Sequence, residues 1–224
     1  GWVTEARRTL ALFANRLDEA KRWLSKLPED RVAQMQLAEA YYRRDDFPEA
    51  ARLLRKAGRD AQAERLESFQ GTQPNKIEMK SSVSRVSFLM KDPLPVLQAR
   101  VNGKEATLFI DTGAGELVLD DEFATLAGAS LFGSRTGTFA GGKQAPVRYG
   151  RVDSVELGDT RIRNVPVMVQ NVRQFSAPVF GGKPVLGIIG TILLFHFLAT
   201  IDYPRDELTL RPRTEESLRQ FERE

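Results

Sequence analysis

The run Phe109-Ile110-Asp111-Thr112-Gly113 limits what this chain can fold into more than any other five-residue segment does. Two apolar residues typical of a buried strand lead directly into a carboxylate, which is unfavourable to bury unless hydrogen bonds compensate it. The hydroxyl and the glycine that follow can supply such hydrogen bonds and allow a tight turn. The run therefore predicts a buried strand that ends in an acidic loop, although Asp before Thr-Gly is also an ordinary turn or helix N-cap composition.

The residues before Asp111 have the pattern of a β-hairpin. Residues 96–101 are typical of one strand, and residues 105–110 are typical of the returning strand. Between them, Asn102-Gly103 is the preferred sequence of a two-residue type I′ turn. Asp111 is thus expected where this hairpin ends.

A second apolar segment follows much later in the chain. Residues 185–190 are a glycine-punctuated apolar strand that ends in Ile188-Ile189-Gly190, and residues 191–197 are compact enough for a short helix. Residues 199–210 contain two short strand patterns around a Pro-containing turn, which predicts a closing hairpin.

This order of segments resembles the retropepsin-like aspartic protease family, in particular its bacterial single-lobe members, over residues 83–212. The resemblance implies an all-β barrel with one short helix, in which Asp111 is the catalytic acid or base. It implies that Thr112 braces the loop against the backbone of the opposite subunit, that Gly113 permits the tight turn, and that Ala114 is the small residue behind the acid. It places Ile188-Ile189-Gly190 behind the site and implies no metal or organic cofactor.

Aspartic protease chemistry needs two carboxylates that share a proton and activate a water. The chain has a single Asp-Thr-Gly, so the resemblance implies a homodimer with the site on its twofold axis. Asp202 is the alternative second acid if the chain acts as a monomer, although a hairpin role fits it better. Ile192 stands where many relatives have an Asp or Asn that holds the dimer together, which leaves the mode of dimerisation open.

Residues 138–149 lie where members of this family carry the flap, a hairpin that closes over the substrate. By that resemblance, Phe139, Ala140, Gly141 and Gly142 are candidate substrate contacts at its tip. An ordinary hairpin turn fits the paired glycines equally well.

The residues after this hairpin predict two strands and a loop. Residues 151–157 and 161–169 alternate apolar and polar side chains, as a half-buried pair of strands does. Residues 175–182 contain Pro and Gly and are expected to form a loop beside the cleft.

The first part of the chain has a helical pattern with an internal echo, because residues 17–24 recur as residues 47–54. The second copy has the spacing of a tetratricopeptide repeat at Leu37, Ala38, Tyr41, Ala50, Leu54 and Ala57. We therefore expect an α+β chain with TPR-like helices in residues 1–70, a linker in residues 71–82, the protease domain in residues 83–212 and a C-terminal tail in residues 213–224. Because such repeats bury their faces against neighbours, we expect further repeats before Gly1 or docking of these helices on the protease domain.

Composition argues against several other functions. The 33 basic and 30 acidic residues are dispersed, so nucleic-acid binding has little support. No apolar run is long enough to span a membrane. The chain has no Cys and only one His, His196, which excludes the usual zinc sites and every Cys-His or Ser-His site except one built on His196. His196 fits better as a packed or capping residue. Asp120-Asp121-Glu122 is typical of a helix start rather than of a metal site.

The sequence thus favours a homodimeric aspartic endopeptidase that acts on polypeptides, with helices that recruit substrate or a protein partner. One alternative is an inactive protease-like module that serves for dimerisation or peptide binding, with the helices as the working part. Another is a latent enzyme whose cleft is covered by the N-terminal helices or by residues 171–184 until a partner binds. A bacterial periplasmic location rests on the resemblance alone, because a chain without Cys fits either redox compartment.

Overall fold

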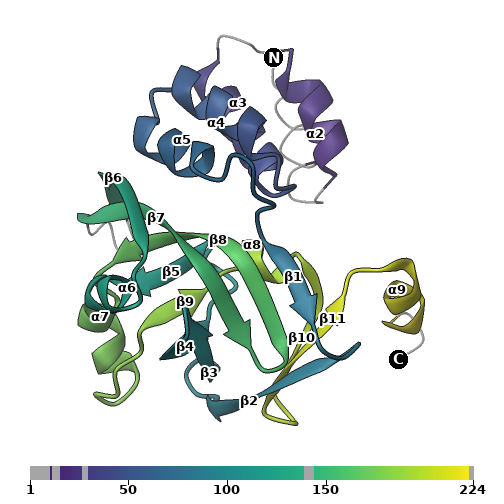
Figure 1. Cartoon of the computed structure of the whole chain (residues 1–224), viewed down its shortest axis with the longest axis vertical. Coiled ribbons are helices and arrows are strands. Elements are labelled where there is room, and N and C mark those ends of the chain that lie inside the picture. The colour runs from purple at the N-terminus through teal and green to yellow at the C-terminus, as the bar shows by residue number, and fades with distance from the viewer. Residues whose placement is uncertain (1–10, 12–15, 27–29, 139–143, 222–224) are drawn as a thin grey trace. The chain divides into compact units, whose positions relative to one another are not determined.

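The computed structural model describes residue 11 and residues 16–26, 30–138 and 144–221 (Figure 1). The chain divides into two compact units, Gly1–Thr72 and Gln73–Glu224. The first is helical and the second is built on a sheet, so the structure is a mixed α+β chain.

The first unit contains four described helices of at least two turns, α2 (Leu17–Leu24), α3 (Arg31–Tyr42), α4 (Phe47–Lys56) and α5 (Asp60–Glu67), and each packs on the next along the chain. The side chain of Asp30 caps α3 by accepting the backbone N–H groups of Val32 and Ala33 at 2.8 and 3.0 Å. Buried alanines such as Ala38 and Ala50 let the helices approach closely. Helices are therefore present as expected, while a tetratricopeptide repeat stays a prediction.

The second unit contains an eleven-stranded sheet. Its strands are β1 (Lys76–Met79), β2 (Ser84–Met90), β3 (Val96–Val101), β4 (Lys104–Ile110), β5 (Leu117–Asp120), β6 (Ser130–Thr138), β7 (Gln144–Leu157), β8 (Thr160–Gln170), β9 (Gly187–Ile189), β10 (Phe197–Asp202) and β11 (Glu207–Pro212). The strand order is β10-β11-β2-β3-β4-β9-β5-β8-β7-β6, with β1 paired to β8 and a further pairing between β3 and β7.

The hairpins predicted from turn chemistry are present. Val101 of β3 pairs with Lys104 of β4, which leaves Asn102 and Gly103 as the two-residue turn. Both turn residues have positive φ, 49° and 78°, as a type I′ turn requires. The closing hairpin is present as the pair β10 and β11, and the paired strands expected after the flap are present as β7 and β8.

The prediction of an all-β domain with one short helix is wrong in its helix content. Helices α6 (Asp121–Leu126), α7 (Val172–Val179), α8 (Thr191–Leu194) and α9 (Glu215–Phe221) all belong to the second unit. The expected C-terminal tail contains α9, and α6 begins at the acidic run where the sequence predicted a helix.

The prediction of a loop over residues 175–182 is also wrong, because residues 175–179 belong to α7. The side chain of Asn171 accepts the N–H of Gln174 at 3.0 Å, and the carboxylate of Asp120 accepts the N–H of Arg173 at 3.1 Å. Both satisfy backbone donors at the start of the helix. Pro178 is the second-last residue of α7, where its missing N–H removes one i→i−4 hydrogen bond of the helix.

The expected linker, residues 71–82, is also replaced in part by regular structure. Its residues Lys76–Met79 form β1, which pairs antiparallel with β8 from Lys76 opposite Arg163 to Met79 opposite Thr160. An ion pair of 2.8 Å between Arg163 and Glu78 joins the two strands. The segment is therefore an edge strand of the second unit.

Side chains on the two faces of the sheet belong to separate apolar clusters. On β4, Leu108 and Ile110 belong to the larger cluster, together with Phe123 of α6 and many residues of β7 and β8. Phe109, which lies between them in the sequence, points to the other face and belongs to a smaller cluster with Ile188 of β9.

Candidate active site

Strand β9 lies between β4 and β5 and positions the end of β4. It runs parallel to β4, with Ile110 opposite Ile189, and antiparallel to β5, with Val118 opposite Ile188. The N–H of Asp111 donates to the carbonyl of Ile189 at 3.1 Å. The sheet therefore brings Asp111 and the glycine strand together, although they are far apart in the sequence.

The loop that begins at Asp111 is organised by its own backbone. The Oδ1 atom of Asp111 accepts the N–H of Gly113 at 2.8 Å, and the N–H of Ala114 donates to the carbonyl of Asp111 at 3.1 Å. Asp111 is half-buried, whereas Thr112 and Gly113 are exposed. Within the described ranges, no Lys or Arg forms an ion pair with Asp111.

The far side of the loop is fixed to the start of α8. The N–H and the hydroxyl of Thr191 both donate to the carbonyl of Ala114, at 2.9 and 3.1 Å. The N–H of Ile192 donates to the carbonyl of Gly115 at 2.9 Å. These bonds anchor the loop so that the Asp111 carboxylate has a defined position.

Gly190 is required for this close approach of backbone to backbone. A Cβ atom at Gly190 would lie 2.4 Å from the carbonyl oxygen of Glu116 and 2.6 Å from that of Gly115. Distances this short are repulsive, so any larger residue would displace the loop. The glycine that the sequence placed behind the site thus has a physical reason to be there.

The hairpin expected to carry the flap is formed by β6 and β7. Their last described pair before the tip is Thr138 opposite Gln144. The four candidate tip residues, Phe139, Ala140, Gly141 and Gly142, lie outside the described residues.

Sequence reasoning missed the residues of α7 that lie on the Asp111 face of the sheet. Val172 and Phe180, the residue after α7, are buried against Phe109 and Ile188. The ring centroids of Phe180 and Phe109 are 5.2 Å apart. The available signal was Asn171, a good N-cap residue two positions after the predicted strand of residues 161–169.

Asp202 and His196, the other candidates for chemistry, have structural partners. Arg205 donates to Asp202 through its backbone N–H at 2.9 Å and through Nη1 at 2.7 Å. These hydrogen bonds lower the pKa of Asp202, so this residue stays ionised within the closing hairpin. His196 lies just after α8, with Nδ1 3.0 Å from the carbonyl oxygen of Ile192.

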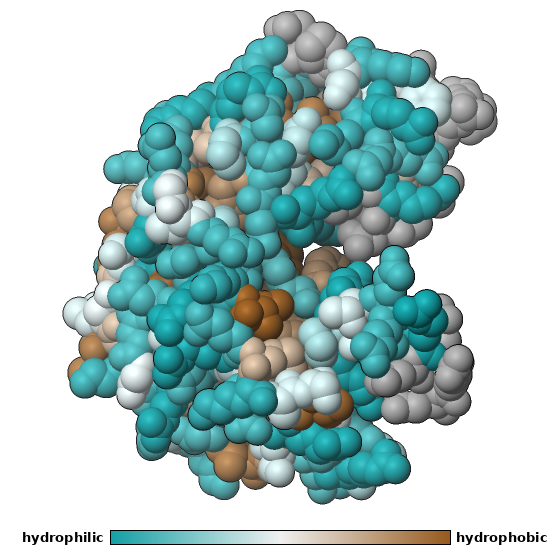
Figure 2. Space-filling view, turned by 45° about the vertical axis from the view of Figure 1, so that its right-hand side comes forward, coloured by the Kyte–Doolittle hydropathy of each residue, from teal (hydrophilic) through white to brown (hydrophobic). Residues whose placement is uncertain are grey.

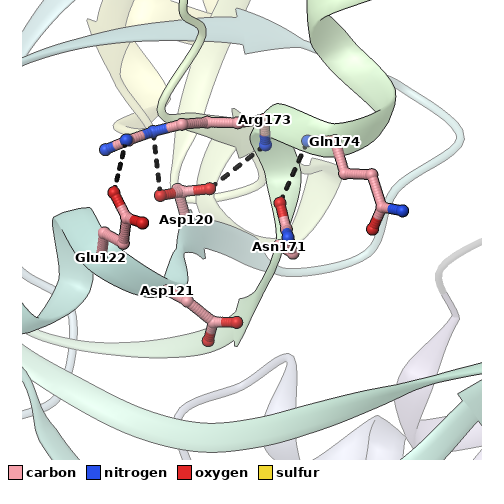
Figure 3. A pocket seen from close by; sticks show the side chains of 6 residues that line it. All are labelled: Asp120, Asp121, Glu122, Asn171, Arg173 and Gln174. Atoms are coloured by element: carbon pink, nitrogen blue, oxygen red, sulfur yellow. Dashed lines mark hydrogen bonds and ion pairs between the residues drawn. The ribbon is translucent and has the colours of Figure 1, made fainter.

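A polar pocket lies where β5 and β8 end and α6 and α7 begin (Figure 3). Its volume is about 450 Å³, and it is lined by Asp120, Asp121, Glu122, Asn171, Arg173 and Gln174. Arg173 bridges two of the acids, with Nε 3.1 Å from Asp120 and Nη1 2.6 Å from Glu122. In the part of the chain that the structure describes, no group of three acidic or His side chains is arranged to hold a metal.

No described helix is both long enough and apolar enough to cross a bilayer. The face shown in Figure 2 is mostly hydrophilic, with hydrophobic residues in small groups.

Residues 97–192 match the model of a protein family described as Aspartyl protease. The matched segment runs from β3 to the start of α8 and includes the Asp111 loop and Gly190. The match supports an aspartic protease domain in the second unit. No curated protein matches the chain.

Several solved structures are similar to this chain. A retropepsin-like aspartic protease from Rickettsia conorii is 24% identical with a TM-score of 0.43, over 62% of this chain and 95% of that one. The EIAV protease in complex with the inhibitor HBY-793 is 16% identical with a TM-score of 0.36, over 46% of this chain and 88% of that one. The retroviral protease-like domain of Ddi1 from Leishmania major is 17% identical with a TM-score of 0.36, over 56% of this chain and 98% of that one.

Proposed function

We propose that this chain is an aspartic endopeptidase that hydrolyses peptide bonds with a water held between the Asp111 carboxylates of two copies. The observation that carries the proposal is the Asp111 loop, which is fixed by the backbone of β9 and α8 and whose acid forms no ion pair with a Lys or Arg of the described residues. The family match over residues 97–192 supports the same chemistry.

The proposed reaction needs one protonated and one ionised carboxylate. Two carboxylates in contact cannot both ionise, so the pair holds one proton at neutral or acidic pH. The ionised Asp111 takes a proton from the water while the water oxygen attacks the peptide carbonyl carbon. The protonated Asp111 donates its proton to the carbonyl oxygen. The carboxyl that took the proton from the water then passes it to the amide nitrogen, while the other carboxylate accepts a proton from a hydroxyl of the intermediate. The C–N bond breaks, a carboxylic acid and an amine are released, and the two carboxylates have exchanged roles between the two steps.

A second copy is the proposed source of the second carboxylate. Strand β9, which lies beside the Asp111 loop, ends in Ile188-Ile189, is followed by Gly190 and carries no acid. Thr112 and Gly113 are exposed in the single chain, so a partner subunit can contact them. The proposed role of Thr112 is to bond the partner's backbone and brace the two loops against each other.

Strand β10 is the proposed place where two copies meet. It is the outermost strand of the sheet order, and no described strand pairs with its free edge. Its pairing with β11 is regular over all six residues, and residues 197–201 contain no charged residue and no proline. Natural edge strands are usually protected by such residues or by bulges, so this edge favours pairing with the same strand of a second copy.

The helical unit is proposed to recruit the substrate or a protein partner. Its consecutive helices pack through small buried residues, including Ala38, Ala50 and Ala57, as stacked helical repeats do. Val32 at the start of α3 is 57% exposed and offers an apolar contact.

The proposal is tested by light scattering over a range of concentrations, combined with a peptide-library cleavage assay on the same sample. We expect a dimer that cleaves peptides at acidic to neutral pH and that loses this activity in Asp111→Asn. Asp159→Asn, a change at an exposed turn, is the matched control and keeps the activity. A folded dimer that cleaves no peptide, or cleavage that persists in Asp111→Asn, contradicts the proposal.

A further inference from the structure

The face of the sheet that carries Asp111 also carries an apolar surface directly beside it. Side chains alternate along a strand, so Phe109 and Asp111 project to the same side of β4. Phe109 lies opposite Ile188 on β9, and Ile188 lies opposite Val118 on β5. Ala114, within the loop itself, packs against this cluster.

This surface is already filled by another part of the same chain. Phe180, at the end of α7, is 3% exposed, and its ring lies 5.2 Å from that of Phe109 with an angle of 44° between the ring planes. Val172, at the start of α7, is fully buried in the same cluster. As a result, Phe109 and Val118 are each only 5% exposed and Ile188 is 6% exposed.

The segment that carries Phe180 is held at both ends. At the start of α7, Asp120 and Asn171 accept the N–H groups of Arg173 and Gln174. At its end, the N–H of Phe180 donates to the carbonyl of Ser176 at 3.0 Å, and the N–H of Lys183 donates to the carbonyl of Phe180 at 3.2 Å. Phe180 is therefore a fixed part of this face.

A peptide bound for cleavage has its scissile carbonyl at Asp111, and its neighbouring residues are spaced about 3.4 Å apart when the chain is extended. If the proposed function holds, the side chain next to the scissile bond would lie within one residue spacing of Asp111, on the side where Phe109 and Ile188 pack. We propose that Phe180 is a specificity-determining residue, which fills the apolar subsite beside Asp111 and restricts the adjacent substrate position to small side chains such as Gly, Ala or Ser. This inference rests on the proposed function.

The test is a comparison of two peptides that differ only in having Ala or Phe next to the cleaved bond. We expect the wild-type kcat/KM to favour the Ala peptide by at least about 10-fold, since a filled pocket rejects added carbon atoms. Phe180→Ala opens the subsite and shifts the ratio towards the Phe peptide by about 100-fold. Phe180→Leu, which retains most of the volume, gives a smaller shift in the same direction and serves if the alanine variant does not fold.

The control is Phe88→Ala, which truncates a partly buried aromatic residue that packs against the other cluster. We expect it to change cleavage of both peptides by the same factor. If Phe180 has only a structural role, Phe180→Ala also changes cleavage of both peptides by the same factor. An unchanged ratio of the two kcat/KM values in Phe180→Ala therefore overturns the inference. A wild-type preference for the Phe peptide also overturns it, because Phe180 would then have to leave the subsite.

Binding separates this inference from the proposed function. We expect Asp111→Asn/Phe180→Ala to bind the Phe peptide at least about 10-fold more tightly than Asp111→Asn alone, measured by calorimetry. If no variant cleaves but this difference in Kd is found, the subsite inference stands and the proposed protease activity fails. Equal Kd values, or no peptide binding to either protein, overturn the inference itself.

Discussion

Asp111 and Asp120 lie at the ends of β4 and β5, two strands that are consecutive in the chain, and have opposite surroundings. Asp111 directly follows β4, is half-buried, and accepts a hydrogen bond from Gly113 of its own loop. Asp120 is the last residue of β5, is 2% exposed, and is bound by Arg173 through both its backbone N–H and its guanidinium.

The difference shows that one fold places the same side chain in two different environments. A carboxylate is unfavourable to bury without a cation and hydrogen bonds, and Asp120 has both, which fix α7 to the end of β5. Asp111 has backbone hydrogen bonds but no cation among the described residues, so its carboxylate is left for a water, a substrate or a second carboxylate. We therefore expect substitutions at the two positions to affect different properties.

The largest effect is expected for Asp111→Asn. The amide keeps the hydrogen bond from Gly113 but cannot exchange a proton, so peptide cleavage falls by at least about 1,000-fold. The free energy of unfolding changes by less than about 0.5 kcal/mol, as for other accessible positions. Steady-state kinetics and urea unfolding of the same preparation measure both, and a large loss of stability would refute the assignment of Asp111 as an accessible reactive acid.

Asp120→Asn is expected to show the reverse pattern, in which the free energy of unfolding changes more than peptide cleavage does. Removal of the charge leaves Arg173 facing a neutral amide, but the guanidinium is partly exposed, so the loss of stability is about 2 kcal/mol. Urea unfolding measures this loss. The control is Asp121→Asn, whose ion pair with Arg148 is more exposed and contributes less than about 1 kcal/mol. Equal stabilities of the two variants would show that the buried ion pair of Asp120 with Arg173 contributes no more than the exposed pair of Asp121 with Arg148.

Gly190→Ala tests whether peptide cleavage depends on the position of the Asp111 carboxylate as well as on its presence. The added Cβ would lie 2.4 Å from the carbonyl oxygen of Glu116, so the loop must move, at an expected loss of about 1–3 kcal/mol of stability. Cleavage should fall although both carboxylates remain. A variant with normal kcat/KM would mean that the loop can shift without consequence.

Much of this site follows from local sequence, and the rest depends on distant contacts. The hairpin before Asp111 was predictable because Asn102-Gly103 specifies a type I′ turn within two residues. The helix α7 was predictable only in part, because Asn171 is a local N-cap signal but the second capping group, the carboxylate of Asp120, lies on β5. Likewise, Lys76–Met79 is a strand only because β8 provides an edge for it. The packing of Phe180 on Phe109 is also a distant contact, since Phe180 directly follows α7.

The smallest effect concerns Glu78, a carboxylate that pairs across β1 and β8. A hydrogen bond from Arg163 is the main cause that lowers the pKa of Glu78 below its ordinary value of 4.5. A lowered pKa stabilises the fold above the unfolded-state pKa, and this contribution is lost as the pH falls through the folded-state value. We expect Glu78→Gln to be slightly less stable than wild type at pH 7 and equally stable at strongly acidic pH. A difference that grows on acidification would contradict this sign.

The most direct test of the shared site is a subunit-mixing experiment with wild type and Asp111→Asn. Fixed total protein is equilibrated at different wild-type fractions, and peptide cleavage is measured at each. If each active site needs an Asp111 from both copies, activity falls as the square of the wild-type fraction. A linear fall would mean that a single chain completes its own site, and would contradict the account.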